Sequence, residues 1–205
     1  MPASDSGILT VFEEPLTEQP DPLWPDAPAF CPSRPLPEYR YVRGVNPHPR
    51  RHADGHSYGK RLETQPLTQW DWQENEDFLF AIDLYHGAYL WESHEPWTTL
   101  LESSQPDTPE SNLLQALLMN SAAQTAAFEN NPRRASIRSQ TARWRLARIR
   151  AKGFAGPENR FMGFDISDLI DQIVRHYTPV WKQIENGYVR LKGPAPRLLP
   201  EFEED

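Results

Sequence analysis

The chain of 205 residues has a single cysteine and no long hydrophobic run. One cysteine excludes an intrachain disulfide, and Cys31 stands in a proline-rich stretch without metal-ligand spacing around it, which favours a reducing compartment. No apolar run approaches the roughly 18 residues that a membrane-spanning helix needs. Residues 1–15 lack the basic start and the apolar stretch of a signal peptide. We therefore expect a cytoplasmic protein with no membrane partner.

Positive charge is also scarce, because 21 lysines and arginines face 29 acidic residues and the formal net charge is −8. Nucleic-acid-binding domains usually carry net positive charge that displaces counterions from phosphate. The exception is the segment 131–152, whose arginines follow one another with no acid between them and could attract phosphate, RNA or an acidic partner. Acidic segments near both ends of the chain can satisfy the same charges, so the composition argues against a nucleic-acid partner.

Proline and turn residues divide the chain into four parts. Residues 1–37 combine acid with frequent proline and predict a flexible arm. Residues 38–73 mix aromatics with turn pairs and predict an ordered, irregular arm that packs on a helical body. Residues 74–186 predict the helical domain itself, and residues 187–205 predict a short extended segment with an acidic tail.

Helical periodicity within 74–186 predicts an all-α fold. An apolar stripe that begins near Glu74 predicts the first helix. Thr108 as N-cap and Pro109 at the first position predict a second helix, which is apolar almost all round. Asn131 with Pro132 starts a third helix, and Asp165 caps a fourth, which Pro179 could divide into a fifth segment. We expect a compact bundle of helical hairpins, with four to five helices.

The run from His86 to Trp97 holds two glutamates, two histidines and three aromatic residues in what otherwise has the pattern of a core-facing helix. Buried ionisable groups need partners, so Glu92, His94 and Glu95 predict hydrogen-bonded pairing, metal coordination or a ligand pocket. On an ideal helix Glu92 and Glu95 lie about 60° apart, whereas His94 lies nearly opposite Glu92. Pro96 removes a backbone hydrogen bond and should kink the helix.

Three interpretations of this cluster remain open. Glu92 and Glu95 could pair with arginines of 131–152, or cap the kinked backbone, while His94 bonds locally. The cluster could instead line a pocket for a small ligand or a partner. Alternatively, His94, Glu92 and Glu95 could bind a divalent metal as the centre of a hydrolase. The zincin motif would need a second histidine where Thr98 stands, and the Glu-x-x-His motif of di-iron bundles is absent.

The polar residues Gln115, Asn120 and Gln124 interrupt the apolar second helix and strengthen the pocket interpretation, although a solvent-facing edge explains them equally well. The predicted ligand pocket comprises Glu92, His94, Glu95, Gln115, Tyr85, Tyr89 and Trp91. Paired glutamates should have depressed folded pKa values, whereas merely desolvated ones should have raised values.

Three histidines, His48, His52 and His56, recur every four residues in the irregular arm. Pro49 and the Asp54-Gly55 turn argue against a helix here. The arm could deliver one of these histidines to the Glu92 region, but a solvated loop is the expectation.

The segment Trp91-Glu-Ser-His-Glu95, the segment Leu114-Gln-Ala-Leu-Leu118 and the turn Gly163-Phe-Asp165 resemble motifs of the bacterial and archaeal family catalogued as domain of unknown function 309. The similarity covers about residues 74–180. It implies a bundle of helical hairpins that often self-associates, which allows a homo-oligomer, and it implies no established activity. Thr98, Met119 and Ala126 depart from the family's usual residues, which puts a family-wide catalytic role in doubt. We therefore expect ligand or partner binding in a polar Glu/His pocket, with a metal-dependent hydrolase as the alternative.

Overall fold

Most helices of the body begin where the sequence supplies a capping side chain. The computed structural model describes residues 9–60, 64–156, 158–182 and 184–202. Its helices are α1 (Glu76–His86), α2 (Leu90–Ser103), α3 (Pro109–Phe128), α4 (Pro132–Ala151) and α5 (Ile166–Lys182), and the last is followed by a 3₁₀ turn, Ile184–Asn186. The predicted caps Thr108, Asn131 and Asp165 each accept a hydrogen bond from an amide of the first turn, at 3.1, 3.0 and 3.0 Å. The predicted starts of α3, α4 and α5 are therefore confirmed, and α5 continues through Pro179.

The helix predicted from Glu74 onward is wrong as a single element, because the chain breaks between α1 and α2. Ala88 has a φ of 63°, a left-handed conformation that a helix cannot contain. The Tyr89 amide donates back to the Leu84 carbonyl at 2.8 Å and closes the turn. As a result, Glu92 lies in the first turn of a new helix and no longer on the apolar stripe of α1.

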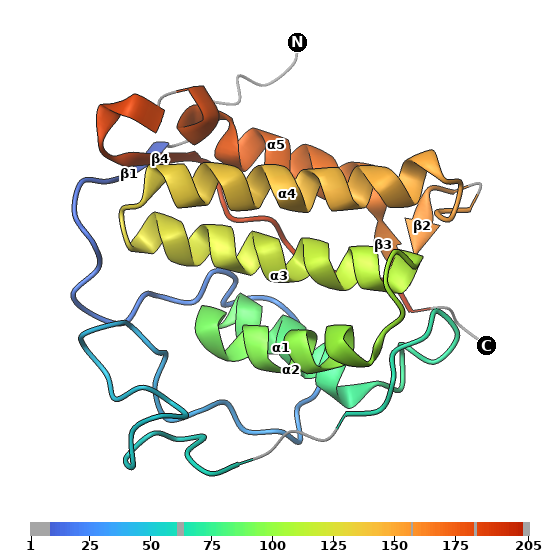
Figure 1. Cartoon of the computed structure of the whole chain (residues 1–205), viewed down its shortest axis with the longest axis horizontal. Helices are drawn as coiled ribbons and strands as arrows, with labels where there is room; N and C mark the ends of the chain where they lie inside the picture. The colour runs from blue at the N-terminus through green and yellow to red at the C-terminus, as the bar shows by residue number, and fades with distance from the viewer. Residues whose placement is uncertain (1–8, 61–63, 157, 183, 203–205) are drawn as a thin grey trace.

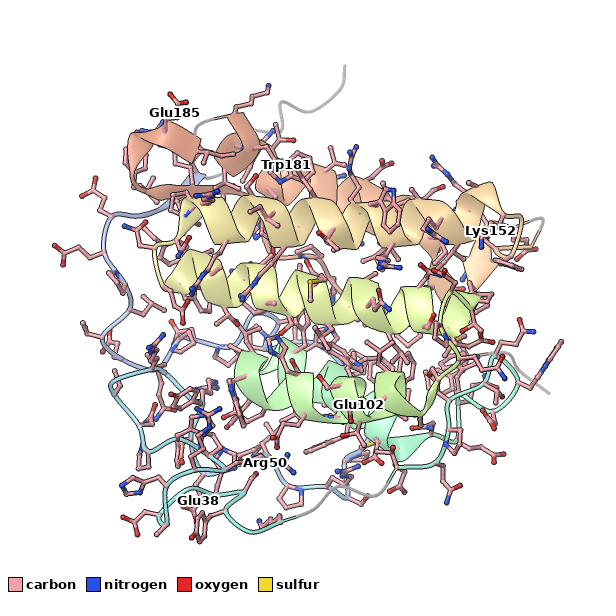
Figure 2. The ribbon with its side chains drawn as sticks, viewed as in Figure 1. Glu38, Arg50, Glu102, Lys152, Trp181 and Glu185 are labelled. Carbon is pink, nitrogen blue, oxygen red and sulfur yellow. The ribbon has the colours of Figure 1, made fainter. Side chains whose placement is uncertain are left out.

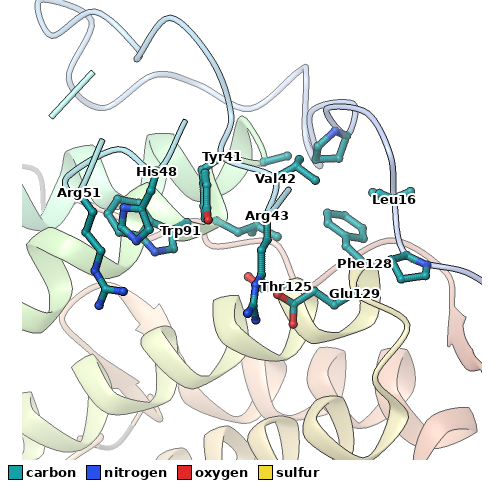
Figure 3. Close-up of a pocket in the computed structure, with 14 residues that line it drawn as sticks. Leu16, Tyr41, Val42, Arg43, His48, Arg51, Trp91, Thr125, Phe128 and Glu129 are labelled. Carbon is teal, nitrogen blue, oxygen red and sulfur yellow. The ribbon is translucent and has the colours of Figure 1, made fainter. Parts of the chain in front are cut away.

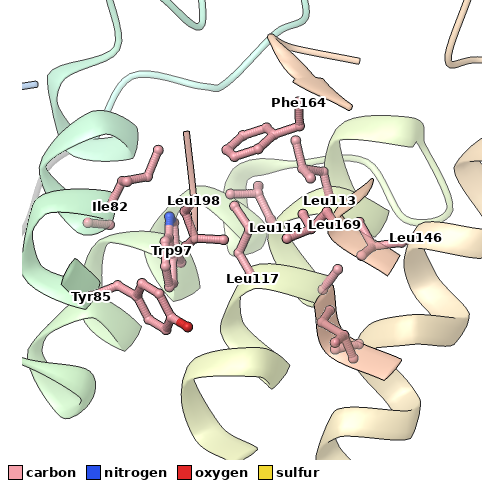
Figure 4. Packing of buried hydrophobic residues seen from close by; sticks show 14 of the residues in the cluster. Ile82, Tyr85, Trp97, Leu113, Leu114, Leu117, Leu146, Phe164, Leu169 and Leu198 are labelled. Atoms are coloured by element: carbon pink, nitrogen blue, oxygen red, sulfur yellow. The ribbon is translucent and has the colours of Figure 1, made fainter. Parts of the chain in front are cut away.

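The helices pack in sequence order. α1 packs on α2, α2 on α3, α3 on α4 and α4 on α5, as Figure 1 shows. The three-residue linker between α3 and α4 makes these two helices an antiparallel pair. Between α1, α2 and α3 lies a core of fully buried side chains, shown in Figure 4, among them Tyr85, Trp97, Leu114 and Leu117. Leu198 of the C-terminal segment also reaches this core.

Two small antiparallel sheets accompany the helices, so the protein is mostly helical but not strictly all-α. β1 (Leu9–Phe12) pairs with β4 (Val189–Lys192), with Leu9 opposite Lys192 and Phe12 opposite Val189. β2 (Arg160–Phe161) pairs with β3 (Phe164–Asp165). Met162 and Gly163 turn between β2 and β3 with φ values of 47° and 74°. A Cβ at Gly163 would lie 2.6 Å from the Glu201 carbonyl oxygen, so only glycine fits this turn.

The N-terminal arm lies along the body. The Leu16 amide donates to the Phe128 carbonyl at 2.9 Å, and the Trp24 amide donates to the His86 carbonyl at 3.0 Å. The amides of Phe30 and Cys31 both donate to the Asp83 carboxylate, at 2.9 and 2.8 Å.

Residues 1–8 of the predicted arm and 203–205 of the predicted tail lie outside the described residues. In the part of the chain that the structure describes, no helix is both long enough and apolar enough to cross a bilayer.

Candidate functional site

Glu92 is the centre of the candidate site, because its carboxyl group is buried at the start of α2 under the arm. Only 4 % of its side chain is exposed. Oε1 accepts the Tyr41 amide at 2.9 Å and lies 3.1 Å from Nε2 of His56. Oε2 is buried and has no hydrogen-bond partner among the described residues. Burying a carboxyl oxygen without a hydrogen-bond partner costs free energy. A bound ligand or a proton at Oε2 would reduce this cost.

His56 reaches Glu92 because the loop before it turns back tightly on itself. The Ser57 amide donates to the Pro49 carbonyl at 3.1 Å, and the Gly55 amide donates to the His52 carbonyl at 2.9 Å. A Cβ at Gly55 would collide with the Pro49 carbonyl, so the close approach requires glycine. The expectation of a solvated loop is therefore wrong for His56, whose side chain is 8 % exposed.

The pKa values of the pair move in opposite directions. Burial, assisted by the negative charge of Glu95, raises the pKa of Glu92 to about 7, against the lowering effect of the Tyr41 amide. Burial, assisted by the positive charge of Lys60, lowers the pKa of His56. The carboxyl group thus exchanges its proton near neutral pH beside an imidazole that is mostly neutral. Such a pair can accept or donate a proton under physiological conditions.

Glu95 belongs to the same region and is paired with the arm. Its Oε1 lies 2.9 Å from Nε of Arg50. Figure 2 shows Arg50, with Glu38, on the arm that covers the side of α2 remote from α4. Burial raises the pKa of Glu95, and the Arg50 guanidinium opposes this rise. Pairing of a glutamate with arginine is thus observed, but the arginine comes from the arm and not from residues 131–152.

A cavity of about 390 Å³ lies beside these groups, between the arm and α1 and α2. Glu92, Glu95 and His56 line it on one side. Its remaining wall is mainly apolar or proline, with ionisable groups from the arm: Arg34, Pro35, Leu36, Pro37, Glu38, Ser57, Lys60, Phe80, Leu84 and Pro96. This volume is within the range of pockets that hold small organic molecules.

His94 does not join this cavity. Its Nε2 atom is buried without a hydrogen-bond partner among the described residues. Burial, assisted by the positive charge of Arg138 on α4, lowers the pKa of His94 to about 4. The Arg138 guanidinium itself donates to the Ala122 carbonyl at 2.9 Å. His94 therefore faces the α3 and α4 side of the molecule, as the predicted angle between it and Glu92 requires.

Tyr85 lies in a separate buried network. Its hydroxyl donates to the Pro196 carbonyl at 2.8 Å and accepts Nδ2 of Asn120 at 3.0 Å. Gln124 continues the network, because its Oε1 lies 3.0 Å from Nε2 of His176 and accepts the Tyr177 hydroxyl at 3.2 Å. Asn120 and Gln124 are thus explained by internal hydrogen bonds, and not by a solvent-facing edge or a pocket wall.

The other predicted pocket residues are distributed elsewhere. Tyr89 is buried beneath the Arg40 guanidinium, whose carbon lies 5.0 Å from the ring centre. Trp91 lines a different cavity, with Tyr41 and His48. Gln115 is half-buried on α3 and does not line the cavity of Glu92. The structure therefore brings together two of the predicted residues, Glu92 and Glu95.

The structure does not bring the predicted metal ligands, His94, Glu92 and Glu95, together as a donor set. Within the described ranges, no group of three or more His, Cys, Asp or Glu side chains is arranged to hold a metal ion. His94 is the donor that fails to converge, because it lies on the other side of α2 from Glu92. The residues that sequence reasoning missed are Tyr41 and Arg50, and the repeated arm histidines were the signal that pointed to this part of the chain.

Comparison with known protein families, with curated proteins and with solved structures finds no match to this chain.

Proposed function

We propose that the protein binds a small organic ligand in the cavity beside Glu92, and that the ligand presents an N–H donor, as an amide or amine does. The observation that carries this proposal is the unpartnered, buried Oε2 of Glu92, together with the position of Glu92 in the wall of a cavity of about 390 Å³. Oε1 already accepts the Tyr41 amide and faces His56, so Oε2 is the atom left for a ligand.

The charges around the cavity support a donor group on the ligand. Two of the cations in this region are already paired, since Arg34 lies 2.8 Å from Asp77 and Arg50 lies 2.9 Å from Glu95. Arg40 is the cation whose charge acts on ionised Glu92, and its lowering of the Glu92 pKa is a smaller effect than the rise caused by burial. An N–H group at Oε2 would replace the missing hydrogen bond and favour the ionised carboxylate.

The apolar part of the ligand would pack against the rest of the wall. Phe80, Leu84 and Pro96 provide apolar surface from α1 and α2, and Leu36 provides it from the arm. Pockets of this kind bind mainly through apolar contact, and a few polar groups fix the orientation. The proposal is therefore a ligand with a hydrocarbon or aromatic body and one N–H group.

The experiment uses benzylamine and benzamide as probes, with methyl benzoate as the analogue that lacks an N–H donor. The ¹³C resonance of the Glu92 carboxyl group should shift saturably with at least one of the two donors and not with the ester. Glu92→Gln keeps an oxygen for Tyr41 but replaces the free oxygen by an NH₂ group, so binding should weaken at least tenfold. Glu102→Gln, an exposed change on the same helix, is the matched control. The absence of any saturable shift, or equal binding by the Glu92 variant, would refute the proposal.

Membership of the family catalogued as domain of unknown function 309 is part of the same proposal. Its three motif segments lie in α2, in α3 and at the turn into α5, and all three contribute to the helical body. Cytoplasmic residence is also proposed, and the single cysteine of the chain supports it. The metal-dependent hydrolase is not favoured, because no described set of donors converges at Glu92.

A further inference from the structure

We propose that a second cavity, lined by Trp91 and not by Glu92, binds a nucleoside monophosphate. This cavity of about 400 Å³ lies between the arm, the start of α2 and the end of α3. Three features of its wall argue for this class of ligand: a set of aromatic rings, two guanidinium groups that pair with no described residue, and hydrogen-bonding groups on α3. The inference is independent of the ligand proposed for the cavity beside Glu92.

The aromatic rings offer a surface for a planar base. Trp91, Tyr41 and His48 contact one another, with ring centres 5.7 Å apart for Tyr41 and Trp91 and 5.0 Å apart for His48 and Trp91. All three side chains are only partly buried, and Tyr41 and His48 of the arm lie against Trp91 of α2. Aromatic side chains of this kind bind nucleobases by stacking, at about 1–3 kcal/mol for each base.

Two arginines provide the charge for a phosphate group. Arg43 and Arg51 line the cavity, and Figure 3 shows their guanidinium groups on either side of Trp91, extending in the same direction. Neither guanidinium has a hydrogen bond or an ion pair with another described residue, whereas Arg34 and Arg50 of the same arm are both paired with acids. Guanidinium groups bind phosphate through paired hydrogen bonds.

The start of α2 adds to the positive potential of this cavity. Leu90 and Trp91 both line it, and the capping residue, Tyr89, supplies no side-chain hydrogen bond to the first turn. The first amides of a helix have no acceptor within the helix. They therefore complement the arginines in attracting an anion.

The α3 side of the cavity limits the charge of the ligand. Thr125 and Glu129 line it there, and the Glu129 carboxylate is only loosely paired with Arg134, at 3.9 Å. A carboxylate repels a second or third phosphate but accepts hydrogen bonds from the hydroxyl groups of a ribose. The combination fits one phosphate, one base and a sugar.

The experiment titrates the full chain with each of the four common ribonucleoside monophosphates and follows the indole resonance of Trp91. At least one monophosphate should bind saturably, and its affinity should exceed those of the matching nucleoside and of inorganic phosphate by at least tenfold. The double variant Arg43→Gln/Arg51→Gln should weaken this binding at least tenfold. Arg150→Gln/Arg175→Gln, which makes the same change of charge away from the cavity, should leave it unchanged.

Three results would overturn the inference. The first is that no monophosphate binds. The second is that the nucleoside or inorganic phosphate binds as well as the monophosphate, because the base and the phosphate would then not be recognised together. The third is equal affinity in the Arg43/Arg51 variant and the wild-type chain. Since both arginines are exposed, their replacement should not affect folding, which circular dichroism would verify.

Discussion

Glu92 is held by the arm at one carboxyl oxygen and left free at the other. The Tyr41 amide and the His56 ring fix Oε1, so the rotation of the carboxyl group is limited even when no ligand is present. This arrangement keeps Oε2 in a constant position, which reduces the entropy that a ligand would have to remove. The burial that goes with this arrangement makes ionisation of the Glu92 carboxyl group unfavourable.

This unfavourable ionisation predicts the pH dependence of the Glu92→Gln variant. Burial raises the pKa of Glu92 from 4.5 to about 7, so the folded state holds the proton more tightly than the unfolded state between these values. Stability contributed by this group is therefore lost as the pH rises from about 4.5 to about 7. At about 1.4 kcal/mol for each pH unit, the loss is about 3 kcal/mol. Glutamine does not titrate, so this loss is absent in the variant, and urea denaturation should show its stability rising more steeply between pH 4.5 and 7 than that of the wild-type chain.

The matched control for this measurement is Glu102→Gln, at an exposed position of α2. Its stability should follow the wild-type pH profile. If the stability of Glu92→Gln follows the wild-type pH profile between pH 4.5 and 7, the carboxyl group is not desolvated as the structure indicates.

The loop from Pro47 to Tyr58 acts as one element, because it carries both His48 and His56 into different cavities. His56 lies against the Tyr39 ring with centres 4.7 Å apart, and the Tyr39 hydroxyl donates to the Pro47 carbonyl at 2.8 Å. These contacts make the two cavities dependent on one loop conformation.

Gly55→Ala should displace this loop. The added methyl group would overlap the Pro49 carbonyl, so the backbone has to move and His56 should leave Glu92. We expect the His56 ring resonances to shift to positions typical of an exposed histidine, with a loss of stability of about 1–3 kcal/mol. Ala53→Ser, an exposed change in the same loop, is the control. Unchanged His56 resonances in Gly55→Ala would contradict the packing described for this loop.

The elements differ in how well the sequence predicts them. α3 and α4 carry local start signals, Thr108 with Pro109 and Asn131 with Pro132, and both are confirmed to the residue. The break at Ala88 has a weaker local signal, His86 and Gly87 at the end of α1, and alanine itself favours helix, so its surroundings impose the left-handed conformation. The partners of Glu92 are more than 30 residues away in the chain, and helical periodicity contains no information about such contacts.

At the scale of the whole molecule, histidines with lowered pKa values determine how the stability of the fold changes with pH on the acid side. Burial lowers the pKa of His86 to about 4, with a further effect of Arg197, and burial also lowers the pKa values of His94 and His176 to about 4. The unfolded chain therefore binds more protons between about pH 4 and 6.5. The stability that these neutral rings contribute is present above 6.5 and is lost as the pH falls through this range.

Urea denaturation of the wild-type chain should accordingly show increasing stability from pH 4 to about 6.5. Above about pH 6.5 the histidines no longer titrate while Glu92 still ionises, so the stability should then decrease with pH. His94→Gln should reduce the acid-side slope, since the pKa of this ring is lowered to about 4 by burial. His52→Gln, at an exposed position, should leave the slope unchanged. A flat profile between pH 4 and 6.5 would contradict the burial of these rings.

The docking of the arm on Asp83 gives the only cysteine of the chain a further use. Burial and the negative charge of Asp83 raise the pKa of Cys31 to about 11, and its thiol donates to the Glu76 carbonyl. Alkylation requires an exposed thiolate, so it must wait until the arm separates from α1. The ratio of alkylation rates in the denatured and native chains then measures the equilibrium of arm release, at about 1.4 kcal/mol for each factor of ten. An ordinary thiol reagent therefore reports the free energy of arm release, and with it the opening of both cavities that the arm covers.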